Sequence, residues 1–99
     1  MFTRNEANGY NLTAVLHKEK DGSITVSLNE MDLAENAGTQ ATAIYKLAES
    51  IIEYAEDFYE EFEYWSTAPN RKAHIPYVQD AISQKDVKKL AAQIKIIPE

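Results

Sequence analysis

Five glutamates in the middle of the chain recur at alternating spacings of four and three residues, a pattern that could belong to a metal site or an acid–base pair. The spacing places them on one side of an α-helix, because 3.6 residues complete a turn. Carboxylate metal sites in helical proteins also use histidines three residues away and ligands that face inward from several helices. No histidine lies in this stretch, so we interpret the carboxylates as a solvent-facing or partner-facing surface. The five are Glu49, Glu53, Glu56, Glu60 and Glu63.

The two histidines also lack the neighbours that catalysis requires. His17 ends an alternating apolar segment, and His74 follows a basic turn. The chain has no cysteine nucleophile, and its three scattered glycines cannot form a phosphate-binding loop. We therefore predict no enzyme activity, no cofactor, and no catalytic or metal-binding residue. A small hydrolase that uses His74 is kept as an alternative.

Residues 65–77 carry the side chains typical of a protein-binding segment, with aromatic, cationic and amide groups beside two prolines. Tryptophan, tyrosine and arginine are enriched at binding hot spots. The alternative is that this segment caps the preceding helix and fills the core, and both roles can hold together. The predicted partner-binding residues are Glu56, Glu60, Glu63, Trp65, Asn70, Arg71, His74 and Tyr77.

Charge is unevenly distributed along the 99 residues, whose formal net charge is −6. Residues 49–70 hold seven carboxylates and no lysine or arginine, whereas residues 71–99 hold six cations against three acids. The acidic centre would repel phosphate backbones and attract a basic protein. We therefore predict a small basic protein as the partner. DNA binding is expected only weakly, through lysines of the last helix, or within a complex.

The remaining composition indicates where the protein works. No apolar run approaches the roughly 18 residues that a membrane-spanning helix needs, and the N-terminus has no signal-peptide pattern. The absence of cysteine fits a reducing compartment. We expect one domain over residues 1–99, located in the cytoplasm and without a membrane partner.

The first third of the chain has the period-two alternation of half-buried strands. After a flexible tail at residues 1–9, residues 10–17 and 23–29 both alternate, and Asp21-Gly22 between them suits a hairpin turn. A short third strand can follow before Gly38. We predict an antiparallel hairpin or three-stranded meander over residues 10–37.

A long amphipathic helix is predicted over residues 39–67, with Thr39 as its N-cap and Pro69 after its end. Its apolar stripe runs through Ile44, Ala48, Ile51, Ala55, Phe58, Phe62 and Trp65. The aromatic half extends beyond a sheet of typical length, so either the C-terminal segment or a second chain must cover it. We favour a homodimer, whose interface would contain Phe58, Tyr59 and Phe62.

The C-terminal segment, residues 70–99, is predicted to be mainly helical. A short helix can follow Pro76, and a last helix starts at Ser83 or Asp86 and runs through Gln93. Residues 94–97 either extend that helix or form an edge strand. The fold class is therefore α+β, with the meander packed on one long helix.

This order of elements resembles the HicB-like antitoxins of type II toxin–antitoxin systems. The resemblance covers residues 10–65: the strand at 10–17, the turn Lys20-Asp21-Gly22-Ser23, the strand at 24–28, and a helix opened by Gly38-Thr39. It implies a dimeric protein that neutralises a small basic ribonuclease and often represses its own operon. The family's Pro-Gly link is absent from residues 30–36, the helix is longer, and no complete DNA-binding module follows. The Phd/YefM-related antitoxins are a neighbouring possibility with similar partner logic.

We therefore predict a non-enzymatic binding protein, the antitoxin of a toxin–antitoxin pair, that neutralises a basic toxin through its acidic helix. The alternative is a structural module for homo-oligomerisation, with the apolar stripe as its interface.

Overall fold

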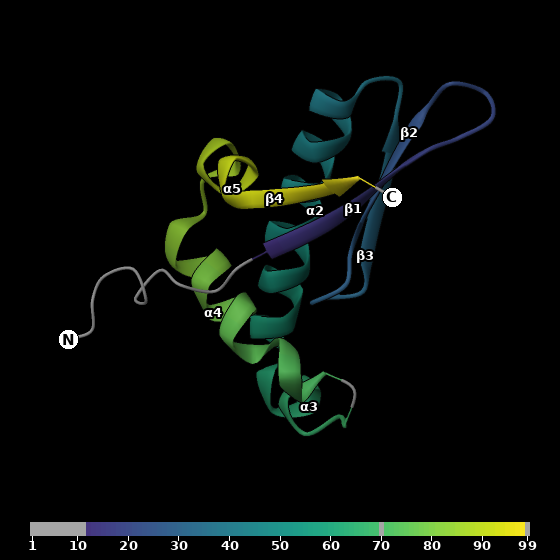
Figure 1. The fold of residues 1–99 in the computed structure, drawn as a ribbon. Coiled ribbons are helices and arrows are strands. Elements are labelled where there is room, and N and C mark those ends of the chain that lie inside the picture. The colour runs from purple at the N-terminus through teal and green to yellow at the C-terminus, as the bar shows by residue number, and fades with distance from the viewer. Residues whose placement is uncertain (1–11, 70, 99) are drawn as a thin grey trace.

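A computed structural model describes residues 12–69 and 71–98, and at its centre a four-stranded sheet packs beside a long helix (Figure 1). The strands are β1 (Leu12–Lys18), β2 (Ile24–Leu28), β3 (Leu33–Ala37) and β4 (Ile94–Pro98), in the order β3-β2-β1-β4. The helices are α2 (Gln40–Glu60), α3 (Phe62–Ser66), α4 (Ile75–Gln84) and α5 (Val87–Gln93), with a 3-10 turn, η1, at Lys72–His74. The tail predicted at residues 1–9 lies outside the described residues.

The three-stranded meander is present, and its turns follow the local chemistry of the chain. β1 pairs with β2 and β2 pairs with β3, both antiparallel. In the first hairpin the Glu19 N–H donates to the Ser23 carbonyl at 2.8 Å, and Gly22 adopts φ +92°, a left-handed angle that glycine tolerates best. The alternation also holds, because Ile24, Val26 and Leu28 are all buried.

The prediction of a purely antiparallel sheet was wrong, because a fourth strand joins it. β4 pairs in parallel with β1, with Leu12 opposite Ile94 and Leu16 opposite Pro98, so the sheet is mixed. This also answers the open question about residues 94–97, which form a strand. Parallel neighbours need a long crossover connection, and here the whole chain from β2 to α5 lies between them. No local pattern in residues 94–98 indicates such a distant partner.

Helix α2 begins as predicted and supplies much of the core. The Thr39 hydroxyl accepts a hydrogen bond from the Thr42 N–H at 3.2 Å, which caps the first turn. One face packs against β2 and β3, while α4 and α5 pack beside it. The buried residues of the helix are Ala43, Leu47, Ala48, Ile51, Ala55 and Phe58.

The helix predicted over residues 39–67 is divided in two. α2 ends at Glu60, Glu61 leaves the helical region at φ −121° and ψ 47°, and α3 restarts at Phe62. The last turn of α2 contains no basic residue, and carboxylates at its end meet the negative end of the helix dipole. That unfavourable charge arrangement is a physical reason for the break.

The C-terminal segment folds back along α2, one of the two expected ways of covering its aromatic half. α4 and α5 both pack on α2, and Val78, Ala81 and Leu90 join the core beside Phe58. The short helix expected after Pro76 is α4, which begins one residue before that proline. Of the two predicted starts of the last helix, Ser83 and Asp86, the structure has the second: the Asp86 carboxylate caps α5 by accepting from the Lys89 N–H at 3.1 Å. Within the described ranges, no helix has both the length and the apolar character needed to cross a membrane.

Candidate protein-binding surface

The acidic residues of α2 form an exposed band along the side that faces away from the core. Glu49, Glu53, Glu56 and Glu60 are all exposed, with Asp57 beside them. Glu56 forms an ion pair with Lys85 of the C-cap of α4, at 2.9 Å between Oε2 and Nζ. Neither Glu60 nor Glu63 has an ion-pair partner among residues 12–69 and 71–98. The carboxylates nearest the end of the helix are therefore the ones left for another molecule.

Exposed aromatic rings lie at the same end of the helix, beyond the break at Glu61. Tyr59, Phe62 and Tyr64 are 50%, 37% and 66% exposed. The Tyr59 and Phe62 rings meet edge to face with centroids 5.9 Å apart, and Phe62 rests on buried Phe58 at 6.0 Å. Glu60, Glu61 and Glu63 complete a shallow groove with these rings. We call Tyr59, Phe62 and Tyr64 the aromatic patch and these three glutamates its acidic rim.

The aromatic patch spans the break in the helix at Glu61. Phe62 and Trp65 still contact buried Phe58 across the break, with ring centroids 6.0 Å and 6.5 Å from that of Phe58. After Glu61 the chain turns, and α3 forms a separate tip at the end of α2 (Figure 1). This tip lies away from the sheet (Figure 1), and the acidic rim lines the same groove as the rings.

A polar cluster behind the tip joins α2 to the C-terminal segment. Arg71 Nη1 donates to the Tyr54 hydroxyl at 2.9 Å, and the same hydroxyl lies 2.6 Å from Nδ1 of His74. Because the oxygen already accepts from Arg71, we assign the phenol proton to the bond with Nδ1 and the ring proton to Nε2. Nε2 faces an Asp32 carboxylate oxygen at 4.0 Å. The Arg71 guanidinium also lies over the Trp65 ring, 5.0 Å from its centroid.

Burial determines the protonation state of His74 in this cluster. Its side chain is 4% exposed, and removal from water lowers the pKa of its imidazole below 6.5. The Asp32 carboxylate opposes that shift, and the Arg71 charge adds to it. His74 is therefore neutral near pH 7 and serves as a buried hydrogen-bonding group.

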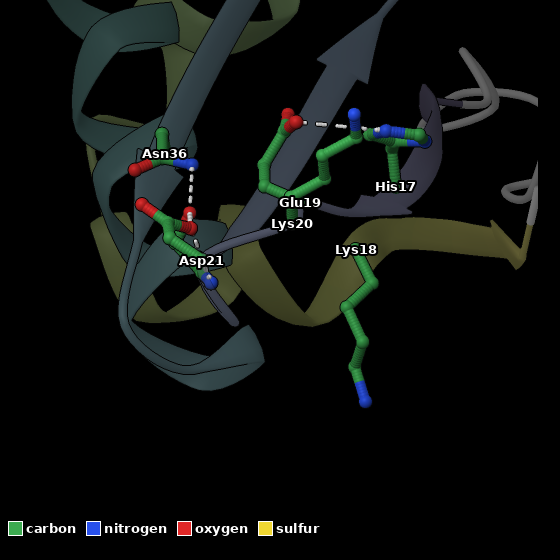
Figure 2. Close-up of a pocket in the computed structure, with 7 residues that line it drawn as sticks. His17, Lys18, Glu19, Lys20, Asp21 and Asn36 are labelled. Atoms are coloured by element: carbon green, nitrogen blue, oxygen red, sulfur yellow. Dashed lines mark hydrogen bonds and ion pairs between the residues drawn. The ribbon is translucent and has the colours of Figure 1, made fainter.

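The first hairpin carries another depression, lined by the turn residues and Asn36, and Figure 2 shows its side chains. Asp21 Oδ1 accepts from both the Ser23 N–H at 2.9 Å and the Ser23 hydroxyl at 2.6 Å, which lowers the pKa of the Asp21 carboxyl. Asn36 donates to the Ser23 hydroxyl at 3.0 Å, and His17 pairs with Glu19 at 3.6 Å. These hydrogen bonds stabilise the turn, and the side chains of Lys18 and Lys20 also line the depression. Nowhere in the described part of the chain do three His, Asp or Glu side chains gather in a metal-binding arrangement.

The residues predicted to bind a partner are thus divided between surface and interior. Glu56, Glu60 and Glu63 are exposed, whereas Trp65, Arg71 and Tyr77 are half-buried and His74 is buried. Asn70 lies outside the described residues. Of the residues predicted for a dimer interface, Phe58 is 1% exposed and belongs to the protomer's own core, so only Tyr59 and Phe62 are accessible to a second chain.

Sequence reasoning missed two features of this region. Tyr54 was not singled out, although its position three residues after Ile51 and four before Phe58 places it beside the apolar stripe. Tyr64 and Glu61 were not counted as binding residues, because an unbroken helix would not have grouped them with Tyr59 and Phe62. A run of carboxylates with no cap or cation at the helix end was the available signal for the break.

Comparisons with known proteins give a consistent result. A PHD-like family model, described as an antitoxin of RelE/RelB toxin–antitoxin systems, matches residues 4–96. The crystal structure of the antitoxin part of a proposed toxin/antitoxin system from Syntrophomonas wolfei subsp. wolfei superposes with a TM-score of 0.85 at 28% identity. That match covers 99% of this chain and 74% of the other. A search of curated proteins found no match.

These matches confirm the expected class and leave its finer assignment open. The expectation of an antitoxin from a toxin–antitoxin system is confirmed. The matching family is PHD-like, which is the neighbouring possibility named from the sequence, and the HicB-like assignment stays a prediction that neither match supports.

Proposed function

The chain belongs to the PHD-like family of antitoxins from toxin–antitoxin systems, and from that membership we propose that it neutralises a small basic toxin by binding it through the acidic end of α2. The observation that carries this proposal is the band of exposed carboxylates from Glu49 to Glu63, whose members near the helix end have no ion-pair partner among the described residues. Such a field attracts a cationic protein and raises its rate of association.

The proposed mechanism separates encounter from tight binding. The carboxylates of α2 orient the approaching toxin, an effect that weakens as salt shortens the range of electrostatic attraction. Desolvated contacts then hold the complex, since exposed ion pairs alone contribute little net affinity. No group in this mechanism performs a chemical step, so the protein acts by binding the toxin.

The direct test is capture of the toxin followed by its neutralisation. Tagged full-length chain is expected to retain a small basic protein from its native host at low salt and to release it as salt rises. The captured protein, identified by mass spectrometry, is then expressed with and without this chain. Growth restored by co-expression supports antitoxin function, whereas an unchanged growth defect contradicts it.

The role of charge is tested with variants matched in net charge. Glu60→Gln with Glu63→Gln removes two negative charges from the end of α2, and is expected to slow association with the captured toxin at low salt. The control, Gln40→Lys with Ala41→Lys, shifts the net charge by the same amount at exposed positions in the first turn of α2, at the other end of the helix. Equal association rates for the two variants would rule out local steering.

A second candidate function is self-association, because Tyr59 and Phe62 present apolar surface that a second copy could bury. Sedimentation of the purified full-length chain separates this candidate from toxin binding. A stable dimer that dissociates when Tyr59 is replaced by glutamate would favour it.

A further inference from the structure

The aromatic patch concentrates apolar surface that the rest of the fold covers. Among the described residues, three of the five large hydrophobic side chains with extensive exposure are Tyr59, Phe62 and Tyr64, all within six positions. Large exposed apolar surfaces rimmed by polar groups mark interaction sites. The C-terminal segment packs on α2, and Phe58 lies in the core, yet these three rings stay exposed.

The acidic rim specifies the chemistry of the molecule that fits here. Glu60, Glu61 and Glu63 are exposed around the rings and form no ion pair within residues 12–69 and 71–98. The faces of tyrosine and phenylalanine rings attract cations, and arginine binds best because its planar guanidinium stacks on a ring and pairs with a carboxylate. The patch therefore offers both partners that a guanidinium group uses.

The same rim disfavours a second copy of this chain. A two-fold dimer interface brings one surface against itself. Pairing through the aromatic patch would therefore bring two sets of rim carboxylates together. The patch and its rim contain no lysine or arginine that could lie between them. Like charges facing across an interface weaken it. The charge arrangement thus selects a cationic partner over self-association at this place.

We infer that the aromatic patch and its acidic rim form a docking site for an arginine-bearing amphipathic segment of the partner protein. The guanidinium stacks on the exposed rings and pairs with the rim, while apolar neighbours of the arginine cover the remaining ring surface. This inference rests on the proposed antitoxin function and names the part of the toxin surface that meets the end of α2.

The test uses the full-length chain and a defined peptide. A synthetic helical peptide of arginine and leucine is titrated into the 15N-labelled chain, alongside an identical peptide in which citrulline replaces arginine. Citrulline keeps the shape of arginine and removes its charge. The expected result is a set of chemical-shift changes centred on residues 57–65, with binding at least about tenfold weaker for the citrulline peptide.

Ring variants separate this patch from a general attraction of peptides to the acidic band. Tyr59→Ala with Tyr64→Ala removes two exposed rings and leaves every carboxylate, and is expected to weaken arginine-peptide binding by about tenfold. Tyr45→Ala is the matched control, because Tyr45 is 42% exposed on the first half of α2 and outside the patch. It should bind the peptide like the unmodified chain.

Three outcomes would overturn the inference. The first is equal binding of the citrulline peptide, and the second is unchanged peptide binding by the double ring variant. The third is that the unmodified chain forms a dimer and the double ring variant does not. The proposed function is judged separately by toxin capture and growth rescue. If the double ring variant still holds and neutralises the toxin as well as the unmodified chain, the docking site is wrong and the antitoxin function stands. If the unmodified chain neutralises no toxin, the function fails whatever the peptide result.

Discussion

The polar groups at the two ends of this molecule differ in whether they bond to other groups of the chain. At the β1–β2 hairpin, Asp21, Ser23 and Asn36 bond one another, and the turn is complete within the chain. At the tip formed by α3, the rim carboxylates have no ion-pair partner among the described residues, and the rings of the aromatic patch face solvent. A closed network adds to stability, whereas an open one is available for recognition. The comparison therefore predicts that mutations at the hairpin lower stability and mutations at the tip lower binding.

The largest expected effect lies at the base of the tip, where Phe58 belongs to the core and Tyr59 does not. Phe58→Ala should lower the free energy of unfolding by about 3–5 kcal/mol, because it leaves a cavity in the core. Tyr59→Ala should change it by less than about 1 kcal/mol, since the ring is half-exposed. Urea unfolding of both variants measures the difference. Similar losses would show that the tip is a structural part of the core.

The next effect concerns the polar cluster that joins the tip to the C-terminal segment. Tyr54→Phe removes the hydroxyl that bonds both Arg71 and His74, and leaves Nδ1 of a buried imidazole without that partner. The expected loss of unfolding free energy is about 1–3 kcal/mol. Tyr45→Phe, at an exposed position of the same helix, is the control and should be neutral in thermal unfolding. Equal stability of the two variants would mean that the cluster contributes nothing.

A smaller effect is expected at the hairpin. Gly22 adopts a left-handed φ of +92°, so Gly22→Ala should cost about 1–2 kcal/mol of stability through backbone strain. Binding of the arginine peptide should not change, because the turn lies at the other end of the molecule (Figure 1). A variant that folded normally but lost peptide binding would contradict the division between the two ends.

The smallest effect is a dependence of stability on pH through His74. Its folded-state pKa lies below the ordinary value of 6.5 because the ring is buried. As pH falls through about 6.5 the unfolded chain takes up the proton first, so stability should decrease towards acid pH and be fully present above that value. The unfolding free energy should therefore fall more steeply between about pH 8 and about pH 5.5 for the unmodified protein than for His74→Gln. His17 is present in both proteins, so its contribution cancels. Parallel curves would show that His74 does not control this dependence.

Much of the fold was predictable where structure depends on neighbours along the chain. The alternation of residues 24–28, the Asp21-Gly22 turn and the Thr39 cap all appear where their spacing placed them. The acidic band is also exposed as predicted, because its members share one side of α2 and the apolar stripe occupies the other. Each of these features needs only the period of a strand or helix, or a single capping bond.

The candidate site was less predictable. Glu60 and Glu63 were identified, but Arg71 and His74, expected to contact a partner, instead bond Tyr54 inside the molecule. Residue type indicated their hydrogen-bonding capacity and gave no information about which group would satisfy it. The grouping of Tyr64 with Tyr59 and Phe62 depended on a change of chain direction at one residue, which a periodic pattern cannot show.

The sequence alone thus determined the helix faces, the strand alternation and the acidic charge of the surface, because these follow from residue spacing and type. Tertiary structure decided the parallel pairing of β4 with β1, the packing of α4 on α2, and the division of the aromatic residues between core and tip. These features join segments that are distant along the chain, and their free energy comes from contacts that exist only when the whole chain is folded. Local sequence patterns do not indicate such contacts, so these tyrosines and glutamates could be identified as a candidate binding site only from the folded structure.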